Sequence, residues 1–230
     1  ISRCLSCVLN ETIPALDQPG RLQWWADLES AKRRLVYTLL DLGLPVVPRS
    51  QDPQGGFGFA FLEDRRSNPS VELEHVLTGY SAGLITVNLL EAHSPSRELA
   101  RGNLGEPYRT LLGHFRHESG HYYWEILVAG TDLHERFRDL FGDERSDYAA
   151  AMEAHYRQGP DAPRNPGAIS RYAEAHPLED WAECWAHYLH MYDTLQTAEQ
   201  FGLITGSPAS DFDARHNEWV GLAVAMNELN

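Results

Sequence analysis

The chain has 230 residues, of which 43% are hydrophobic and 23% are charged, and its formal net charge at pH 7 is −14. This composition is that of an ordinary globular protein, and no apolar run approaches the roughly 20 residues of a transmembrane helix. Nonspecific binding to nucleic acid needs clustered Lys and Arg, whereas the only short basic run here, residues 32–34, is expected on a solvated helix face. We therefore predict neither a nucleic acid nor a membrane partner.

The N-terminal segment carries two of the three cysteines. Cys4 and Cys7 have the spacing of one zinc knuckle, but a closed structural zinc site needs four ligands. Three interpretations stay open: half of a zinc ribbon whose partner ligands lie upstream, plain reduced cysteines, and a redox pair. Residues 1–20 are thus predicted to be the remnant of a ribbon or a linker. Three cysteines cannot build a disulfide framework, which favours a cytoplasmic location.

The first residues contain neither a signal-peptide pattern nor an initiator Met, so we expect the chain to begin inside a longer gene product. An amphipathic helix is then predicted over residues 22–42, because apolar residues recur at helical spacing until Gly43 and Pro45 end the pattern. Two strands are predicted next. Aromatic residues alternate with small ones over 57–61, and a run rich in β-formers covers 84–90.

Beyond Pro107 nearly all of the chain has a helical pattern, with a break rich in Pro and Gly at 159–167. A small sheet followed by a mainly helical part indicates an α+β fold, with one catalytic domain over 21–230. The helices of the second part are predicted over 108–129, 132–141, 146–157, 178–196 and 210–228.

One of these helices carries the motif His117-Glu-Ser-Gly-His121. Residues four apart project from one helix face, so both imidazoles can bind one tetrahedral metal, while Glu118 lies beside its open coordination position. Metal-assisted hydrolysis requires this arrangement, with Glu118 as the general base. Apolar neighbours give the helix a buried side, and Gly120 leaves room for the close approach of another backbone. The alternative is a pair of ordinary histidines.

A catalytic zinc takes three protein ligands, so a third donor must come from elsewhere in the chain. In the segment 176–187, Pro177 suits a helix start, and Glu179 and Glu183 share one face because they are four residues apart. One carboxylate can bind the metal while the other accepts a hydrogen bond from a ligating imidazole. Two solvated glutamates are the ordinary alternative, which the apolar residues of this helix disfavour.

Two further histidines are left out of the predicted ligand set. His114 lies three residues before His117 and can face the same side, yet a zinc with an open position needs no fourth protein ligand. We expect His114 to be structural or to support a ligand. His187 is excluded in the same way.

Four segments, 31–37, 105–124, 141–148 and 175–190, carry a resemblance that extends over nearly the whole chain. The sequence resembles the bacterial family of zinc-binding metallopeptidases in which a zinc ribbon precedes a gluzincin-like catalytic domain. The resemblance implies a zincin-like fold, with the small N-terminal sheet packed on the active-site helix, and a peptide or protein substrate. Only Cys4 and Cys7 of the expected ribbon are present, so a second, structural zinc would need upstream ligands.

A more distant resemblance bears on the roles of individual residues. The helix from Glu179 to Glu183 is similar to the Glu-x-x-Ala helix of gluzincins such as anthrax lethal factor and the bacterial Mlc titration factor. There the first glutamate binds zinc, and a tyrosine seven residues earlier points into the site. The resemblance implies that Glu179 is the third ligand, that Glu183 supports a ligating histidine, and that Tyr172 donates a hydrogen bond to the oxyanion. Tyr172 also fits a packed aromatic residue.

These patterns together predict a zinc-dependent metallopeptidase that uses a metal-activated water and Glu118 as general base. By family analogy, the strand at 84–90 is expected to be the edge strand that pairs with an extended substrate. One alternative is a catalytically silent metal-binding module that recognises a peptide or protein partner. Another is an aspzincin with Asp132 as a ligand, although the rest of that motif is missing. The sequence predicts no oligomeric state.

Overall fold

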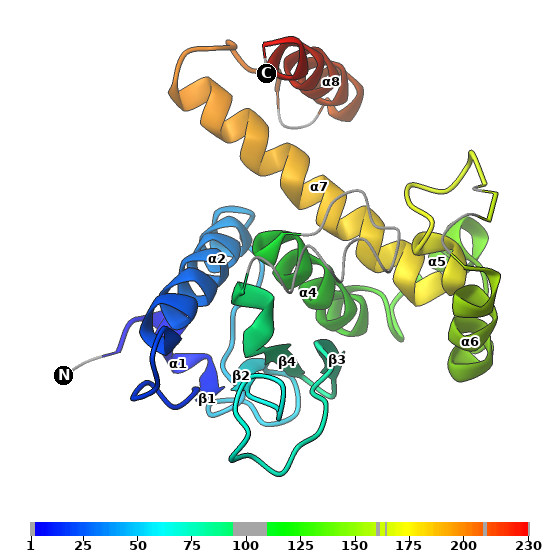
Figure 1. The fold of residues 1–230 in the computed structure, drawn as a ribbon. Helices are drawn as coiled ribbons and strands as arrows, with labels where there is room; N and C mark the ends of the chain where they lie inside the picture. Colours follow the sequence, from blue (N-terminus) through cyan, green and yellow to red (C-terminus); the bar gives the residue numbers. More distant parts are fainter. Residues whose placement is uncertain (1–2, 94–109, 160–161, 164, 209–210, 230) are drawn as a thin grey trace. The chain divides into compact units, whose positions relative to one another are not determined.

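The computed structural model describes residues 3–93, 110–159, 162–163, 165–208 and 211–229. The chain divides into two compact units, Ile1–Trp185 and Ala186–Asn230. In chain order the first unit contains α1 (Leu5–Val8), β1 (Asn10–Thr12), α2 (Arg21–Asp41), β2 (Gly58–Leu62), β3 (Gly79–Ser81), β4 (Leu84–Asn88), η1 (Leu89–Ala92), α4 (Leu111–Leu127), α5 (His134–Phe141), α6 (Tyr148–Gln158), η2 (Ala173–Ala175) and the first part of α7 (Pro177–Gln200) (Figure 1).

The sheet has the strand order β1-β2-β4-β3. Strands β1, β2 and β4 are parallel, and β3 runs antiparallel to β4 at the edge. Our expectation that residues 84–90 form an edge strand was therefore wrong, because β4 is paired on both sides. Alternation of apolar and polar residues along a strand indicates which of its faces is buried, but it does not indicate whether another strand pairs with it on one side or on both. The edge strand β3 spans only three residues, which is too short to produce a pattern.

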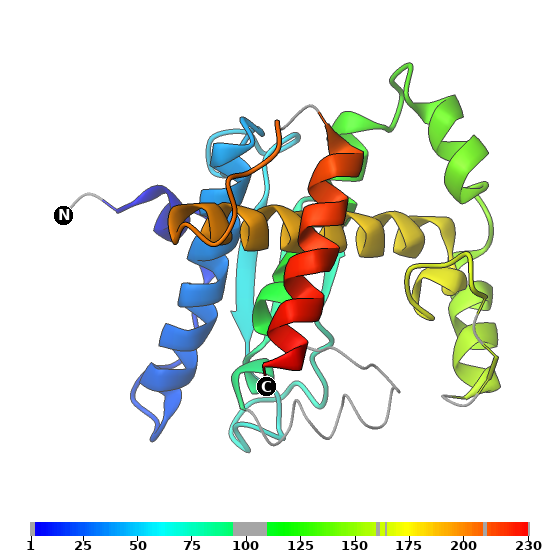
Figure 2. The same ribbon diagram turned by 90° about the horizontal axis from the view of Figure 1, so that it is seen from above.

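Alternating aromatic residues on β2 and immediately before it build the core between the sheet and two helices. The side chains of Phe57, Phe59 and Phe61 are almost completely buried. Phe61 packs edge-on against Trp25 of α2 at 4.8 Å between ring centroids, and Phe115 of α4 contacts Phe59 at 5.7 Å. Helices α2 and α4 pack against each other over the sheet (Figures 1 and 2). The sheet therefore supports the helix that carries the histidine motif.

Helix α2 buries Leu28, Leu35 and Leu39 completely, as the helical spacing indicates. Lys32, which we expected on a solvated face, is also buried. Its ammonium group contacts the side chains of Asn10 and Glu29 and lies close to aromatic rings of the core. A buried charge requires such partners, and their positions could not be read from the sequence.

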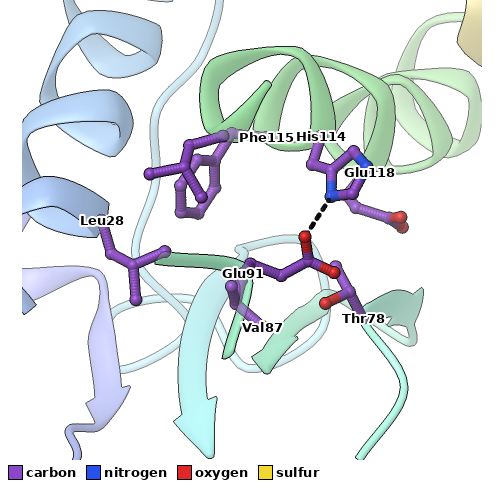
Figure 3. Close-up of a pocket in the computed structure, with 8 residues that line it drawn as sticks. Leu28, Thr78, Val87, Glu91, His114, Phe115 and Glu118 are labelled. Atoms are coloured by element: carbon purple, nitrogen blue, oxygen red, sulfur yellow. Dashed lines mark ion pairs between the residues drawn. The ribbon is translucent and has the colours of Figure 1, made fainter. Parts of the chain in front are cut away.

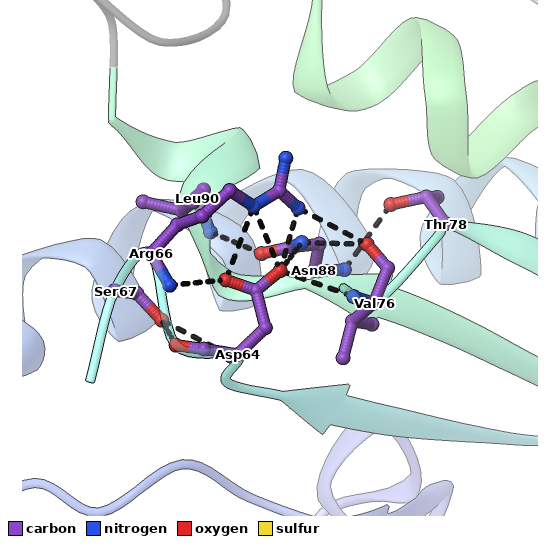
Figure 4. A network of polar contacts seen from close by, with 7 residues as sticks. All are labelled: Asp64, Arg66, Ser67, Val76, Thr78, Asn88 and Leu90. Atoms are coloured by element: carbon purple, nitrogen blue, oxygen red, sulfur yellow. Dashed lines mark hydrogen bonds and ion pairs between the residues drawn. The ribbon is translucent and has the colours of Figure 1, made fainter. Parts of the chain in front are cut away.

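The loop that leads into β3 is fixed by a network around Asp64 (Figure 4). The buried carboxylate of Asp64 accepts hydrogen bonds from the backbone N–H of Val76 at 3.0 Å and from the side-chain amide of Asn88 at 2.8 Å. The guanidinium of Arg66 pairs with the same carboxylate. Because Asn88 ends β4 and Val76 precedes β3, this network fixes the approach of the chain to the sheet edge.

The second unit contains the rest of α7 and α8 (Phe212–Glu228). Arg215 of α8 pairs with Glu199 at 2.9 Å and donates to the carbonyl of Ser207 at 3.0 Å. In the part of the chain that the structure describes, no helix is both long and apolar enough to cross a bilayer. The expectation of an α+β fold with a small N-terminal sheet and a mainly helical C-terminal part is confirmed.

Candidate metal centre

Helix α4 presents both histidines of the motif on one face. Thr110 is the N-cap residue of this helix, and its hydroxyl accepts a hydrogen bond from the backbone N–H of Gly113 at 3.0 Å and so caps the first turn. The rings of His117 and His121 lie 5.1 Å apart between centroids, as expected for residues separated by one helical turn. Phe115 and Tyr122 point the other way, into the core.

Helix α7 crosses α4 at Gly120, which lies between the two histidine turns. A Cβ atom at Gly120 would lie 3.0 Å from the Cα of Ala182, which is tighter than an ordinary contact, so a larger residue would push the two helices apart. Two indole N–H groups fix the crossing: Trp181 donates to the carbonyl of Gly120 at 2.8 Å, and Trp185 donates to the hydroxyl of Ser119 at 3.1 Å. The room that we expected Gly120 to provide is used by α7.

The crossing brings the Glu179 carboxylate between the two imidazoles. One oxygen of Glu179 lies 3.0 Å from Nε2 of His117, and the other lies 3.6 Å from Nε2 of His121. Donor atoms of these three residues all lie within 4.8 Å of one another. Ligands of a tetrahedral zinc at about 2.0–2.1 Å are separated by about 3.3 Å. The donor types and their spacing therefore fit zinc.

Two neighbours orient these donors. Glu183, one turn after Glu179, lies 2.8 Å from Nδ1 of His117, so the N–H at that position can point to a carboxylate and leave Nε2 free for a metal. The hydroxyl of Tyr148, at the start of α6, donates to Glu179 at 2.8 Å. Sequence reasoning did not identify Tyr148. Its segment contributed only to the family resemblance, and nothing in its local pattern indicates that it reaches α7.

The titratable groups of the site differ in the direction in which their pKa values are shifted. Burial alone would lower the pKa of His117, but its hydrogen bonds to Glu179 and Glu183 outweigh burial and raise that pKa well above its ordinary value. Burial and the nearby His117 lower the pKa of His121 to about 4. Burial would raise the pKa of Glu179, yet the hydrogen bond from His117 and the electrostatic interaction with the nearby His121 bring it down to about 2. At neutral pH, Glu179 is ionised and His121 is neutral, which are the forms that bind metal, whereas His117 has to release a proton when metal binds.

Glu118 lies on α4 next to a small pocket that α2, α4 and the end of the sheet form (Figure 3). Burial raises the pKa of its carboxyl, the nearby His117 opposes this rise, and Glu179 adds to it. The imidazole of His114 lines the same pocket and pairs with Glu91 of η1 at 3.2 Å between Nδ1 and the carboxylate. His114 thus contacts a carboxylate, and it does not join the donors at His117.

Of the three other residues that were considered from the sequence, only Tyr172 lies beside a proposed ligand. The ring of Tyr172 lies beside that of His117, at 5.7 Å between centroids. Asp132 is exposed in the turn before α5 and does not join the donor group. His187 belongs to the second unit.

Cys4 and Cys7 are both reduced, and their sulfur atoms lie 3.4 Å apart. The thiol of Cys4 donates a hydrogen bond to the sulfur of Cys7. Among the described residues, no His, Asp or Glu completes a metal-binding group of three with them. The three interpretations of this pair therefore stay open.

The chain is similar to known proteins over most of its length. A sequence model of the family described as "Putative zinc-binding metallo-peptidase" matches residues 21–230. The chain is 42% identical over 236 residues to an uncharacterized protein of Mycobacterium bovis and to uncharacterized proteins of two strains of Mycobacterium tuberculosis. Each match covers 99% of this chain and 67% of the relative. No solved structure matches. The chain belongs to the family of zinc-binding metallo-peptidases that this model describes.

Proposed function

We propose that this chain is a zinc-dependent peptidase in which His117, His121 and Glu179 hold the metal and Glu118 is the general base. The observation that carries the proposal is that donor atoms of these three ligands lie within 4.8 Å of one another. Glu118 follows His117 directly on α4. Two ordinary histidines would not need a buried glutamate between them, because burying a carboxylate is costly without such a role or partner.

When bound at these three residues, zinc supplies a Lewis acid that makes water a stronger acid and polarises a peptide carbonyl. Residues of the chain orient the ligands and transfer the protons. Glu183 fixes the tautomer of His117, and Tyr148 holds the Glu179 carboxylate in its orientation. Glu118 accepts a proton from the attacking water and delivers it to the leaving amine, and no covalent intermediate with the protein is needed.

Tyr172 is our candidate for stabilising the oxyanion. Its ring lies beside His117, and burial raises the pKa of its hydroxyl, which therefore stays protonated and able to donate a hydrogen bond. Tyr172 lies seven positions before Glu179, which matches the spacing in the gluzincins that the sequence resembles.

The proposed substrate is a peptide or protein segment in extended conformation. The edge strand β3 lies next to α4 and contacts it, so a peptide that pairs with β3 would pass beside the histidine face. This assigns to β3 the role that we expected of residues 84–90.

Zinc analysis combined with a peptide-library screen of the wild-type protein and Glu118→Gln tests the proposal. We expect one zinc per chain in both proteins, and hydrolysis that falls about 10²–10⁴-fold in the variant because the base is lost while the metal stays. Equal hydrolysis by both proteins would exclude Glu118 as the base. Zinc binding with no hydrolysis by the wild type would favour a silent metal-binding module.

A further inference from the structure

Tyr80, on the edge strand β3, lies against one of the proposed ligands. Its ring stacks on the imidazole of His121, with 6.2 Å between centroids and 19° between the planes. The Tyr80 hydroxyl donates to the carboxylate of Glu125 at 2.5 Å and accepts from the backbone N–H of Gly83 at 3.0 Å. Glu125 follows His121 by one turn of α4, so Tyr80 is joined to the same helix as the ligand that it covers.

The three proposed ligands differ in what orients them. His117 has Glu183 at its second nitrogen, and Glu179 has the hydroxyl of Tyr148. For His121, by contrast, no hydrogen bond to Nδ1 is seen within the described parts of the chain. An imidazole held only by its bond to Cβ can turn about that bond, which moves Nε2 away from the metal position. An offset aromatic stack restricts that rotation.

We infer that Tyr80 is a positioning residue that holds the imidazole of His121 in its metal-binding orientation, an inference that rests on the proposed function. The stack restrains the plane of the imidazole, and the bonds to Glu125 and Gly83 restrain Tyr80 itself. Because Tyr80 belongs to β3, a peptide that pairs with this strand would contact the residue that positions the ligand. The side chain of Tyr80 therefore links the edge of the sheet to the proposed metal centre.

Three variants test separately the ring of Tyr80, its hydroxyl and the contact with Glu125. Tyr80→Leu removes the ring, Tyr80→Phe keeps the ring and removes the hydroxyl, and Glu125→Ala removes one of the hydroxyl's partners without altering the ring. Tyr37→Leu is the matched control, because Tyr37 is a half-exposed tyrosine of α2. Zinc dissociation constants are measured by chelator competition. In the metal-free proteins, ¹³C relaxation reports the order of the His121 and His117 rings separately.

We expect Tyr80→Leu to weaken zinc binding by about 10-fold or more, since loss of a residue that orients a ligand typically costs 10–100-fold. Tyr80→Phe and Glu125→Ala should have smaller effects of the same sign, and Tyr37→Leu should have none. In the metal-free protein, the His121 ring should become more mobile in Tyr80→Leu while the His117 ring does not change.

Unchanged order of the His121 ring in Tyr80→Leu would overturn the inference, whether or not the protein binds zinc. If the wild type binds no zinc but the His121 ring loosens in Tyr80→Leu, the proposed function fails and the positioning role stands. Should Tyr80→Leu not fold, Tyr80→Phe and Glu125→Ala decide the matter. A His121 ring as rigid in both as in the wild type would then count against the inference.

Discussion

The close crossing of α4 and α7 makes Gly120→Ala an informative substitution. The added methyl carbon would lie 3.0 Å from the Cα of Ala182 and 3.1 and 3.2 Å from two carbons of Trp185. Carbon atoms in favourable contact are about 3.5–4.0 Å apart, so the helices must separate by about half an ångström. Ala182 contributes backbone at this point and cannot move alone.

The energetic effect of Gly120→Ala has two parts of opposite sign. Overpacking costs about 1–3 kcal/mol, whereas alanine improves helix propensity by about 1 kcal/mol relative to glycine. We therefore expect the free energy of unfolding to fall by up to about 2 kcal/mol. Because α4 carries the histidines and α7 carries Glu179, the same shift should weaken zinc binding by about 10-fold or more.

Urea denaturation of the metal-free protein and chelator competition for zinc measure the two effects. Gly221→Ala is the control, since it is the same substitution inside α8 with nothing within 4 Å of the new methyl group. This control should leave zinc affinity unchanged and should not lower stability. If Gly120→Ala keeps the stability and the zinc affinity of the wild type, the crossing does not position Glu179 and our reasoning is refuted.

Three further predictions follow from contacts of the first unit. Glu179→Ala should abolish stoichiometric zinc binding, whereas Glu183→Ala should weaken it by about 10–100-fold. If Glu183→Ala has the larger effect in chelator competition, the third ligand is Glu183 and not Glu179. Tyr148→Phe, which removes the hydrogen bond to Glu179, should raise the zinc dissociation constant without unfolding the protein, and an unchanged constant would show that this bond is dispensable. The Arg138 guanidinium lowers the pKa of Glu144 from 4.5 to about 2, so this carboxylate stabilises the fold above pH 4.5 and loses that contribution as the pH falls toward 2. In urea titrations of metal-free protein, the stability gap between wild type and Glu144→Gln should therefore shrink over this range, and a constant gap would contradict the assignment.

Local patterns predicted the parts of the molecule that depend on residues close in the sequence. The helix carrying His117 and His121 was expected from spacing, and the helix carrying Glu179 was expected over 178–196 against the observed Pro177–Gln200. Burial of Phe59 and Phe61 on β2 was expected from the alternating aromatic residues, but the small residues between them are buried as well, so both faces of this strand are covered. In the two helices the period of side chains along the element determines the face that is buried.

Contacts between distant segments could not be predicted in this way. Tyr148 and Tyr80 approach the centre from α6 and from the sheet edge, 31 residues before Glu179 and 41 residues before His121. Each is a tyrosine in a short element with no distinguishing local pattern. Which strand lies at the edge depends on pairing between strands, and the buried position of Lys32 depends on Asn10, 22 residues earlier. The family resemblance supplied the role of Glu179, which spacing alone left open.

The most direct test of the central proposal is a crystal structure of the zinc-loaded protein with anomalous diffraction at the zinc absorption edge. We expect one strong peak bonded to Nε2 of His117, Nε2 of His121 and a carboxylate oxygen of Glu179, each at about 2.0–2.2 Å, with no fourth protein ligand. A peak on His114, a peak on Glu183 in place of Glu179, or no peak between α4 and α7 at full zinc loading would contradict the proposal.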